Sequence, residues 1–433
     1  MGWWFRIDLW KRVISALILG LVIGLGLRAS LGADTASAIA NDNIKWIGDL
    51  FLRLIRMLIV PLVFFTLVSG VIAMGDPKRL GSLGIKTLGL YFGTTAIAVT
   101  LGLIMGTIFQ PGASLNADSF ASIDTSFMEQ ATEHAAAAGG IIDRLLQIVP
   151  TNPIQGLAEG DILQIIFFAI LFGVGILLAG EAGKPVANFF DSASEVMTRV
   201  TEFVMETAPV GVLALMIWIM ATQGLGVLQS LGTLAIALYL TCVIHIAITY
   251  GGIVKVLLRL PLIPFFRGIT DAQAVAYSTA SSSATLPVTI TCAEENLGID
   301  KAIAASVLPL GATINMDGTA VYIGMVALFG AQALGVDVTL GQYVLVALMA
   351  TLVSIGAAGI PSAGLILSGA ALEQVGIPQG MAWAIIGFIL PFDRLLDMMR
   401  TLTNVTGDTA VATAVAKWEG ELDEVVFRAR DRF

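Results

Sequence analysis

The sequence predicts an all-α polytopic membrane protein with about eight transmembrane helices and two re-entrant helical hairpins. The first observation is composition: 57% of the 433 residues are apolar and 13% are charged, whereas soluble domains carry about a quarter charged residues. The second is that apolar runs of roughly 20 residues, the length that spans a bilayer, recur from Val13 onward. The third is that two later apolar stretches are interrupted by small residues and proline, which indicates backbone breaks at membrane depth.

Six uninterrupted spans are expected at about 13–32, 45–74, 82–109, 157–180, 194–221 and 227–258. The aromatic start, with Trp3, Trp4, Phe5 and Trp10, is typical of an interfacial collar before a retained first helix. The alternative is a cleavable signal peptide that ends in the small residues 35–38. Between the third and fourth spans, region 111–156 is expected to be an extracellular excursion with short helices.

The distribution of charge predicts the orientation and excludes some partners. Basic residues gather before the first span, after the second and sixth spans and at the C-terminal end, whereas the loop after the third span is acidic. Both termini are therefore expected in the cytoplasm, with the chain in the inner (plasma) membrane. The net charge of −9 argues against a nucleic-acid partner. Cys242 and Cys292 lie among apolar or small residues, which makes a disulfide unlikely on sequence grounds, and His134 and His245 are too far apart for a histidine-based metal site.

From about residue 260 the apolar stretches are broken twice in the same way. AYSTASSSATLP precedes NMDGT (Asn315 to Thr319), and SIGAAGIPSAG precedes NVTGDT (Asn404 to Thr409). Broken segments at corresponding positions of two halves are typical of inverted-repeat transporters. The residues 281–283 and 359–361 are therefore expected at the tips of two re-entrant hairpins. Each break alone also fits a flexible turn, a helix kink or an Asx turn.

A stripe of charged and polar residues follows the second break, in DRLLDMMRTLTNVTGD. On a helix, an arc of roughly 100° contains Asp393, Asp397, Arg400, Thr401, Asn404 and Asp408. Ionisable groups inside a span cost several kcal/mol unless they are paired or face a polar cavity. The stripe therefore predicts a site for a small charged solute or ion. The alternative is that Asp397 and Arg400, at i and i+3, form an ion pair that only locks the helix.

Four segments of the chain resemble the signatures of the dicarboxylate/amino acid:cation symporters: SSSATLPVT, GATINMDGTA, GIPSAG and DMMRTLTNVTGD. That family includes the excitatory amino acid transporters and their prokaryotic aspartate and glutamate homologues. The resemblance includes VPTNP and TAPVGV and is weakest around 111–140. It implies a secondary active symporter that carries L-aspartate and/or L-glutamate inward with Na⁺ by an elevator mechanism. A C4-dicarboxylate:cation symporter of the same family is the alternative, and an anion channel is a side activity.

The resemblance also implies a homotrimer whose protomers each divide into two parts. A static scaffold would comprise 1–81 and 111–226. A mobile transport domain would comprise 82–110 and 227–433, with the second hairpin as the extracellular gate. An enzyme is not expected, because the serine triplet has no nearby histidine or lysine base, and no organic cofactor is expected.

An acidic amino acid brings an ammonium and two carboxylates, and each needs a partner. Asp397 suits the ammonium, and Arg400 can hold the distal carboxylate with two parallel N–H bonds. Asn404 and backbone N–H groups near Ser283, Gly359 and Gly364 suit the α-carboxylate. The resemblance adds Thr319, Thr401 and the regions of Ser282 and Pro361 to this substrate-binding set.

The charge count predicts bound cations. Asp317, Asp397 and Asp408 against Arg400 leave about two negative charges, and hard oxygen ligands favour Na⁺. The resemblance implies three ion sites. The first uses Asp408 with carbonyls of Gly311, Asn315 and Asn404; the second uses carbonyls of Thr313, Ser354, Ile355 and Ala357; the third uses Asp317, the Asn315 side chain, Thr94, Thr95 and the Tyr91 carbonyl.

The chain departs from the family pattern at three positions. Many prokaryotic members have an arginine where this chain has Ala280, and the animal transporters have one at the position of Met398. With neither arginine, the extra basic group near the ligand is expected to be missing. Ile323 stands where the animal proteins place a proton-carrying glutamate, so proton transfer at that position is chemically impossible. Neutral amino acid members lack the equivalent of Arg400, whose presence favours an acidic substrate.

Overall fold

The computed structural model consists of packed helices, and it describes residues 7–73, 77–115, 146, 148–355, 357, 359 and 361–429. In chain order the elements are α1 (Leu9–Leu31), α2 (Ala33–Asn43), α3 (Lys45–Ala73), α4 (Pro77–Phe109), α7 (Pro153–Glu159), α8 (Ile162–Leu178), η3 (Gly180–Gly183), α9 (Lys184–Met205), α10 (Ala208–Gln223), α11 (Gly226–His245), η4 (Ile246–Tyr250), η5 (Ile253–Leu257), α12 (Leu262–Gly268), α13 (Thr270–Thr279), α14 (Ser282–Thr291), η6 (Cys292–Asn296), α15 (Lys301–Ile314), α16 (Asp317–Ala333), α17 (Leu340–Ile355), α18 (Ala363–Gln374), α19 (Gln379–Glu419) and α20 (Glu424–Ala429).

The helices confirm the all-α polytopic fold. Within the described ranges, five helices are long and apolar enough to cross a membrane, or six if the pair Gly180–Met205 and Ala208–Gln223, bent by 48°, is one span. The shorter α8 and the 41-residue α19, which carries the charged stripe, complete the eight predicted spans. The third apolar span, Gly84–Phe109, agrees with the prediction, although its helix α4 begins earlier, at Pro77; α2 was not predicted at all.

Both re-entrant hairpins are present as helix–turn–helix units. Hairpin 1 is α13 and α14, which pack against each other and turn at residues 280–281. Hairpin 2 is α17 and α18, which also pack against each other; of the residues that connect them, 357, 359, 361 and 362 are described. Most of the expected extracellular excursion, 116–145 and 147, lies outside the described residues, as do Trp3, Trp4 and Phe5. After it, α7 begins where the Asn152 side chain accepts hydrogen bonds from the backbone N–H groups of Ile154 and Gln155.

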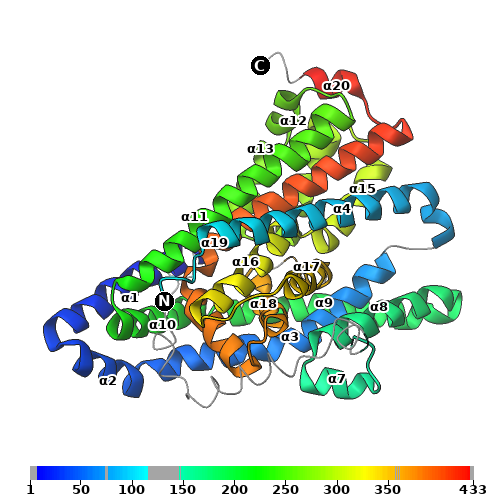
Figure 1. The fold of residues 1–433 in the computed structure, drawn as a ribbon. Helices are drawn as coiled ribbons and strands as arrows, with labels where there is room; N and C mark the ends of the chain where they lie inside the picture. The colour runs from blue at the N-terminus through cyan, green and yellow to red at the C-terminus, as the bar shows by residue number, and fades with distance from the viewer. Residues whose placement is uncertain are drawn as a thin grey trace.

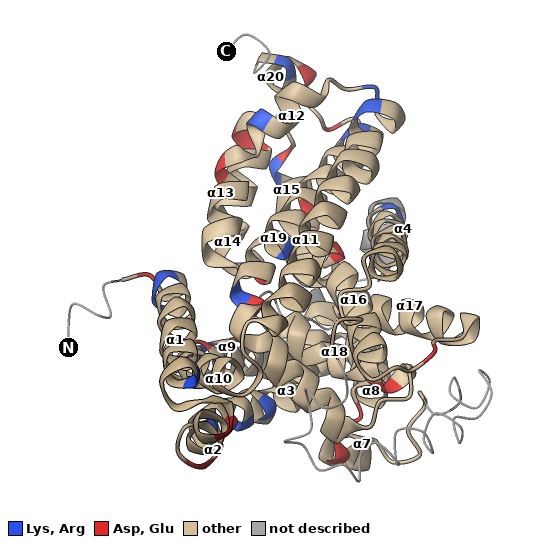
Figure 2. Ribbon diagram, turned by 60° about the vertical axis from the view of Figure 1, so that its left-hand side comes forward, with Lys and Arg blue, Asp and Glu red and all other residues tan. Residues whose placement is uncertain are grey.

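The helices pack in two groups. One group is α1, α2, α3, α8, α9 and α10; the other is α4, α11 and α13–α19, in which α16 contacts α4, α18 and α19. Figure 1 shows α4, α11 and α19 running together, and these three helices contact one another. Figure 2 shows long uncharged stretches on α16, α17 and α18, with charged residues gathered around α12 and α20.

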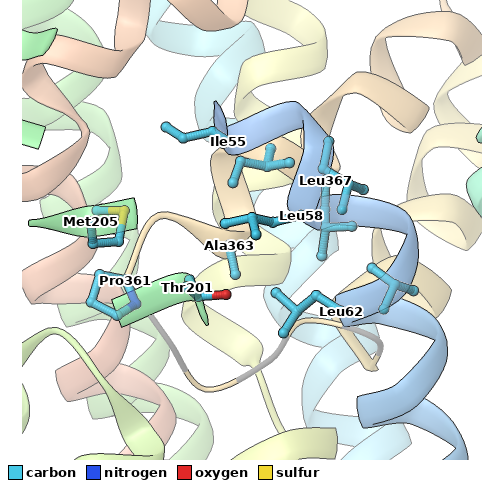
Figure 3. A pocket seen from close by; sticks show the side chains of 11 residues that line it. Ile55, Leu58, Leu62, Thr201, Met205, Pro361, Ala363 and Leu367 are labelled. Atoms are coloured by element: carbon cyan, nitrogen blue, oxygen red, sulfur yellow. The ribbon is translucent and has the colours of Figure 1, made fainter. Parts of the chain in front are cut away.

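Part of the seam between the two groups is apolar. At one point α3 contributes Ile55, Leu58 and Leu62, while hairpin 2 contributes Ala363 and Leu367. Figure 3 shows these side chains facing one another around a small cavity, with Met205 of α9 and Pro361 of hairpin 2 at its edge. Apolar contacts are non-directional, so surfaces of this kind can slide without breaking hydrogen bonds.

Candidate functional site

The tips of the two hairpins meet and bond to each other. The Ser281 hydroxyl donates to the Gly359 carbonyl at 2.6 Å, and the Ser283 N–H donates to the same carbonyl at 3.2 Å. The Ser283 N–H that was expected to hold a substrate carboxylate therefore pairs with hairpin 2 in this arrangement. Ser282, the first residue of α14, is buried.

The predicted stripe of α19 faces the interior, and all six of its members are buried. Arg400 Nη2 lies 2.7 Å from Asp397 Oδ1 and 3.1 Å from Asp393 Oδ1. Its guanidinium also stacks on the Tyr322 ring, 4.0 Å from the centroid. The Asp397–Arg400 ion pair considered as an alternative is thus present, so a substrate carboxylate would compete with it.

The same face of α19 contacts hairpin 2 and α16. The Ser362 N–H donates to Asp397 Oδ2 at 2.7 Å. A Cβ at Gly364 would lie 3.1 Å from Arg400 Nη1 and 2.7 Å from Thr319 Cγ2, so only glycine allows this approach. Asn404 Oδ1 accepts from the Gly318 N–H at 2.8 Å.

The structure therefore places most of the predicted substrate-binding set around one point. Ser283 and Gly359 are joined to each other at the hairpin tips, and a second set joined by direct contacts consists of Thr319, Gly364, Asp397, Arg400 and Asn404. Thr401 is buried on the stripe of α19, and Pro361 lines a cavity at the hairpin tips.

The break between α15 and α16 is the centre of the predicted ion sites. Asn315 and Met316 have non-helical backbone angles, and Asp317 begins α16. All three are buried in a span that is otherwise apolar. Irregular backbone at membrane depth survives where it is buried in protein or lines a polar cavity.

The five residues of the predicted third ion site lie close together at this break. Thr94 Oγ1 donates to Asn315 Oδ1 at 3.2 Å and lies 3.1 Å from the Tyr91 carbonyl oxygen. Thr95 Oγ1 donates to Asp317 Oδ1 at 2.6 Å. These contacts gather carboxylate, amide, hydroxyl and carbonyl oxygens, which are the ligands that hard cations prefer.

Three members of the predicted first ion site lie together, and both the first and the second sites remain predictions. Asn315 Nδ2 donates to Asp408 Oδ1 at 3.0 Å, and a Cβ at Gly311 would lie 2.6 Å from the same oxygen. Asn404 lies one turn before Asp408 on α19. The carbonyls of the second set, those of Thr313, Ser354, Ile355 and Ala357, stand at the ends of α15 and α17; the Ser354 carbonyl accepts from the Ala357 N–H at 3.1 Å.

Two residues of the sixth span belong to this centre and were missed. His245 Nε2 lies 3.1 Å from Asp317 Oδ2, and the Tyr250 hydroxyl donates to that oxygen at 2.7 Å. Thr249 Oγ1 lies 3.1 Å from His245 Nδ1, so the hydroxyl can donate to Nδ1 while Nε2–H donates to the carboxylate. Between them the helix forms the π-helical turn η4, a feature that is frequent at functional sites.

A buried arginine that was not singled out in the sequence lies next to Ala280. Arg394 of α19 reaches hairpin 1, where its Nη2 donates to the Thr279 carbonyl at 2.8 Å, beside Ala280. Four buried carboxylates, those of Asp317, Asp393, Asp397 and Asp408, are thus accompanied by two guanidiniums. The negative charges of Asp393 and Asp397 balance the positive charges of the two arginines. The two uncompensated negative charges therefore fall on Asp317 and Asp408, which belong to the predicted ion sites.

A cavity of about 600 Å³ lies beside the hairpin tips. Ser281, Ser283 and Pro361 line it on one side, and α9 lines it on the other with Glu195, Glu202 and Glu206. Leu9 at the start of α1 is also in its wall. The hairpin tips therefore face an open space at the seam between the two helix groups.

The chain is similar in sequence to known proteins over nearly its whole length. The model of the family described as "Sodium:dicarboxylate symporter family" matches residues 9–418. The chain is 37% identical over 421 residues to the proton/sodium-glutamate symport protein of Geobacillus stearothermophilus, covering 97% of this chain and 96% of that protein. It is 35% identical over 424 residues to the proton/glutamate-aspartate symporter of Escherichia coli (strain K12), covering 97% and 95%. It is also 35% identical over 424 residues to the C4-dicarboxylate transport protein of Anaeromyxobacter sp. (strain K), covering 98% and 92%.

Proposed function

The chain belongs to the sodium:dicarboxylate symporter family, and from this premise we propose that it carries an acidic amino acid, L-aspartate or L-glutamate, into the cell together with Na⁺. It is a multi-pass membrane transporter and not an enzyme. The related proteins are named for glutamate, aspartate or C4-dicarboxylates. The choice among these substrates depends on this chain's own site.

The observation that carries the proposal is the buried Asp397 beside Arg400. A C4-dicarboxylate has two carboxylates and no ammonium, so a second buried carboxylate beside the guanidinium would repel it. An acidic amino acid instead places its ammonium at Asp397 and its distal carboxylate at Arg400. Asn404, whose amide Nδ2 lies 3.5 Å from Thr319 Oγ1, supports the α-carboxylate.

The two negative charges on Asp317 and Asp408 support coupling to cations. Two unpaired carboxylates in a buried site carry a large desolvation penalty, and two bound Na⁺ ions would remove it. Cation binding and substrate binding share structural elements, because Asn404 contacts the backbone of Gly318, next to Asp317, and lies one turn from Asp408. Na⁺ that orders this segment would thereby order the substrate site.

The apolar seam supports movement of one helix group against the other, as in an elevator. The proposed scaffold is 1–81 and 111–226, and the proposed transport domain is 82–110 and 227–433, in a homotrimer with both termini in the cytoplasm of the inner membrane. In that orientation the cavity beside Leu9 faces the cytoplasm, so this arrangement corresponds to an inward-facing carrier. Hairpin 2 would serve as the gate.

The experiment that tests the substrate assignment is calorimetric binding of L-aspartate and succinate to the purified protein in Na⁺. Asp397→Asn is expected to weaken L-aspartate binding by roughly 30-fold or more, since the ammonium loses a buried ionic partner, without weakening succinate. Asp393→Asn, which removes the other carboxylate bound to Arg400, is the matched control. Tight succinate binding by the unaltered protein, or equal losses in both variants, would favour the C4-dicarboxylate reading.

A further inference from the structure

Arg394 is a buried arginine outside the predicted substrate and ion sites. It is 7% exposed and follows Asp393 on α19. Its Nη2 lies 2.8 Å from the Thr279 carbonyl and 3.4 Å from the Ser278 carbonyl, the last two of α13. The final carbonyls of a helix have no partners within the helix, and a cation there both satisfies them and complements the negative end of the helix dipole.

Hairpin 1 turns immediately after these carbonyls. Ala280 has a φ of 51°, in the left-handed region that a residue with a Cβ adopts at a cost of about 1 kcal/mol or more. The surrounding contacts must therefore hold this turn in place. Arg394 provides such a contact from a different element, because it joins the turn to the helix that carries Asp397 and Arg400.

The two hairpin tips and α19 form a closed circuit of hydrogen bonds. Arg394 ties α19 to hairpin 1, the Gly359 carbonyl ties hairpin 1 to hairpin 2, and the Ser362 N–H ties hairpin 2 back to Asp397 of α19. Under the proposed function, the substrate ammonium would compete with Ser362 for Asp397. The Arg394 link does not involve Asp397, because its acceptors are the carbonyls of Ser278 and Thr279.

We propose that Arg394 is a positioning residue that anchors the tip of hairpin 1 to α19, so that Ser281 and Ser283 are held in position while the site exchanges its substrate. The reference to substrate rests on the proposed function; the anchor itself does not. The tip of hairpin 1 carries Ser281 and Ser283, so an anchored tip presents a fixed surface against which hairpin 2 closes.

The surroundings of Arg394 allow its contact with hairpin 1 to be removed without a large change in the free energy of unfolding. Arg394 lines a small, mostly apolar cavity together with residues of α1 and α10, among them Val13 and Val212. In the part of the chain that is described, its Nε and Nη1 have no hydrogen-bond partner. Replacing an incompletely bonded buried charge by an apolar side chain of similar length is often neutral for stability. Arg394→Met should therefore keep the fold and lose the anchor.

The test is hydrogen–deuterium exchange on the full-length protein in nanodiscs, without added substrate, read at separate peptides. Amides of Ala280 and Ala284 report on hairpin 1, and the Ser362 amide reports on hairpin 2. In Arg394→Met, hairpin 1 amides are expected to exchange roughly 10- to 150-fold faster, the range for a hydrogen bond to a charged group, with the Ser362 amide within about twofold of wild type. Arg394→Lys retains the positive charge but not the planar guanidinium, and its hairpin 1 amides are expected to exchange at a rate between those of wild type and Arg394→Met.

Arg199→Met is the matched control, because Arg199 lines the cavity at the hairpin tips but is exposed and paired with Glu202. It should leave both hairpins unchanged. Unaltered hairpin 1 exchange in Arg394→Met, or equal acceleration in every helix, would overturn the proposal. If Arg394→Met does not fold, the lysine variant decides alone: hairpin 1 exchange at the wild-type rate overturns the anchor. Because no substrate is present, a failure of the anchor stays distinct from a failure of the substrate assignment.

Discussion

Replacing Arg400 by cysteine removes the only guanidinium that stacks on Tyr322 and pairs with both Asp393 and Asp397 among the described residues. We expect Arg400→Cys to lose transport of acidic amino acids and to gain transport of neutral ones such as L-serine. A neutral substrate has no distal carboxylate and therefore does not need this guanidinium. Its ammonium can still pair with Asp397.

The magnitude follows from the competition at the site. Truncating one partner of a buried, hydrogen-bonded charge pair costs about 2–5 kcal/mol of binding free energy. The substrate carboxylate must first displace Asp397, which lies 2.7 Å from the guanidinium, so the lower part of that range applies. About 2–3 kcal/mol corresponds to a loss of L-aspartate affinity of roughly 30- to 150-fold.

The same substitution also leaves two buried carboxylates without their cation, which should lower stability by about 3–5 kcal/mol. The double variant Arg400→Cys/Asp393→Asn removes one of those charges and should recover thermal stability without recovering L-aspartate binding. The assay is the melting temperature of each variant together with calorimetric titration of L-aspartate and L-serine in Na⁺. If the double variant regains L-aspartate affinity, Arg400 acts only as a structural ion pair and the assignment fails.

Three further outcomes are expected. Asp408→Asn should raise the Na⁺ concentration for half-maximal uptake by about tenfold or more, since the ion loses a full charge; an unchanged Na⁺ response would remove Asp408 from the ion sites. Tyr250→Phe, which deletes one donor to Asp317, should weaken Na⁺ binding by roughly tenfold, as loss of a group that orients a ligand does; Na⁺ titrations identical to wild type would contradict this. Gly364→Ala should weaken substrate binding at unchanged melting temperature, because the new Cβ would lie 2.7 Å from Thr319 Cγ2; wild-type affinity would mean that hairpin 2 does not close over Arg400.

The part of the site that lies on one helix could be predicted from the sequence. Asp393, Asp397, Arg400, Asn404 and Asp408 share a face of α19 because the helix period alone fixes their directions. Their burial follows from the apolar residues around them. The hairpin tips were also predictable, since small residues and proline interrupt apolar stretches there.

Contacts between distant segments could not be derived in that way. Thr94 and Asn315 are 221 residues apart, and only the family resemblance brought them together in advance. His245 was considered only as one of two possible metal ligands, although His245, Thr249 and Tyr250 are polar residues clustered in an apolar span, which is a signal for a functional centre. Which carboxylate they contact depends on how α11 packs against α16.

Arg394 illustrates a different limit of prediction from the sequence. On the helical wheel it lies about 20° beyond Thr401, just outside the predicted arc. The sequence therefore contained the signal that it lies near the site. Its actual partners are backbone carbonyls of hairpin 1, and backbone groups carry no residue-specific pattern from which such a contact could be predicted.

The most direct test of the proposed function is uptake of radiolabelled L-aspartate into proteoliposomes, with and without an inward Na⁺ gradient and with excess unlabelled L-aspartate, L-glutamate, succinate or L-serine. The proposed function predicts concentrative, Na⁺-dependent uptake that unlabelled L-aspartate blocks and succinate does not. Uptake that ignores the Na⁺ gradient would contradict the assignment of Asp317 and Asp408 to cation sites. Uptake that succinate abolishes would contradict the pairing of Asp397 with a substrate ammonium.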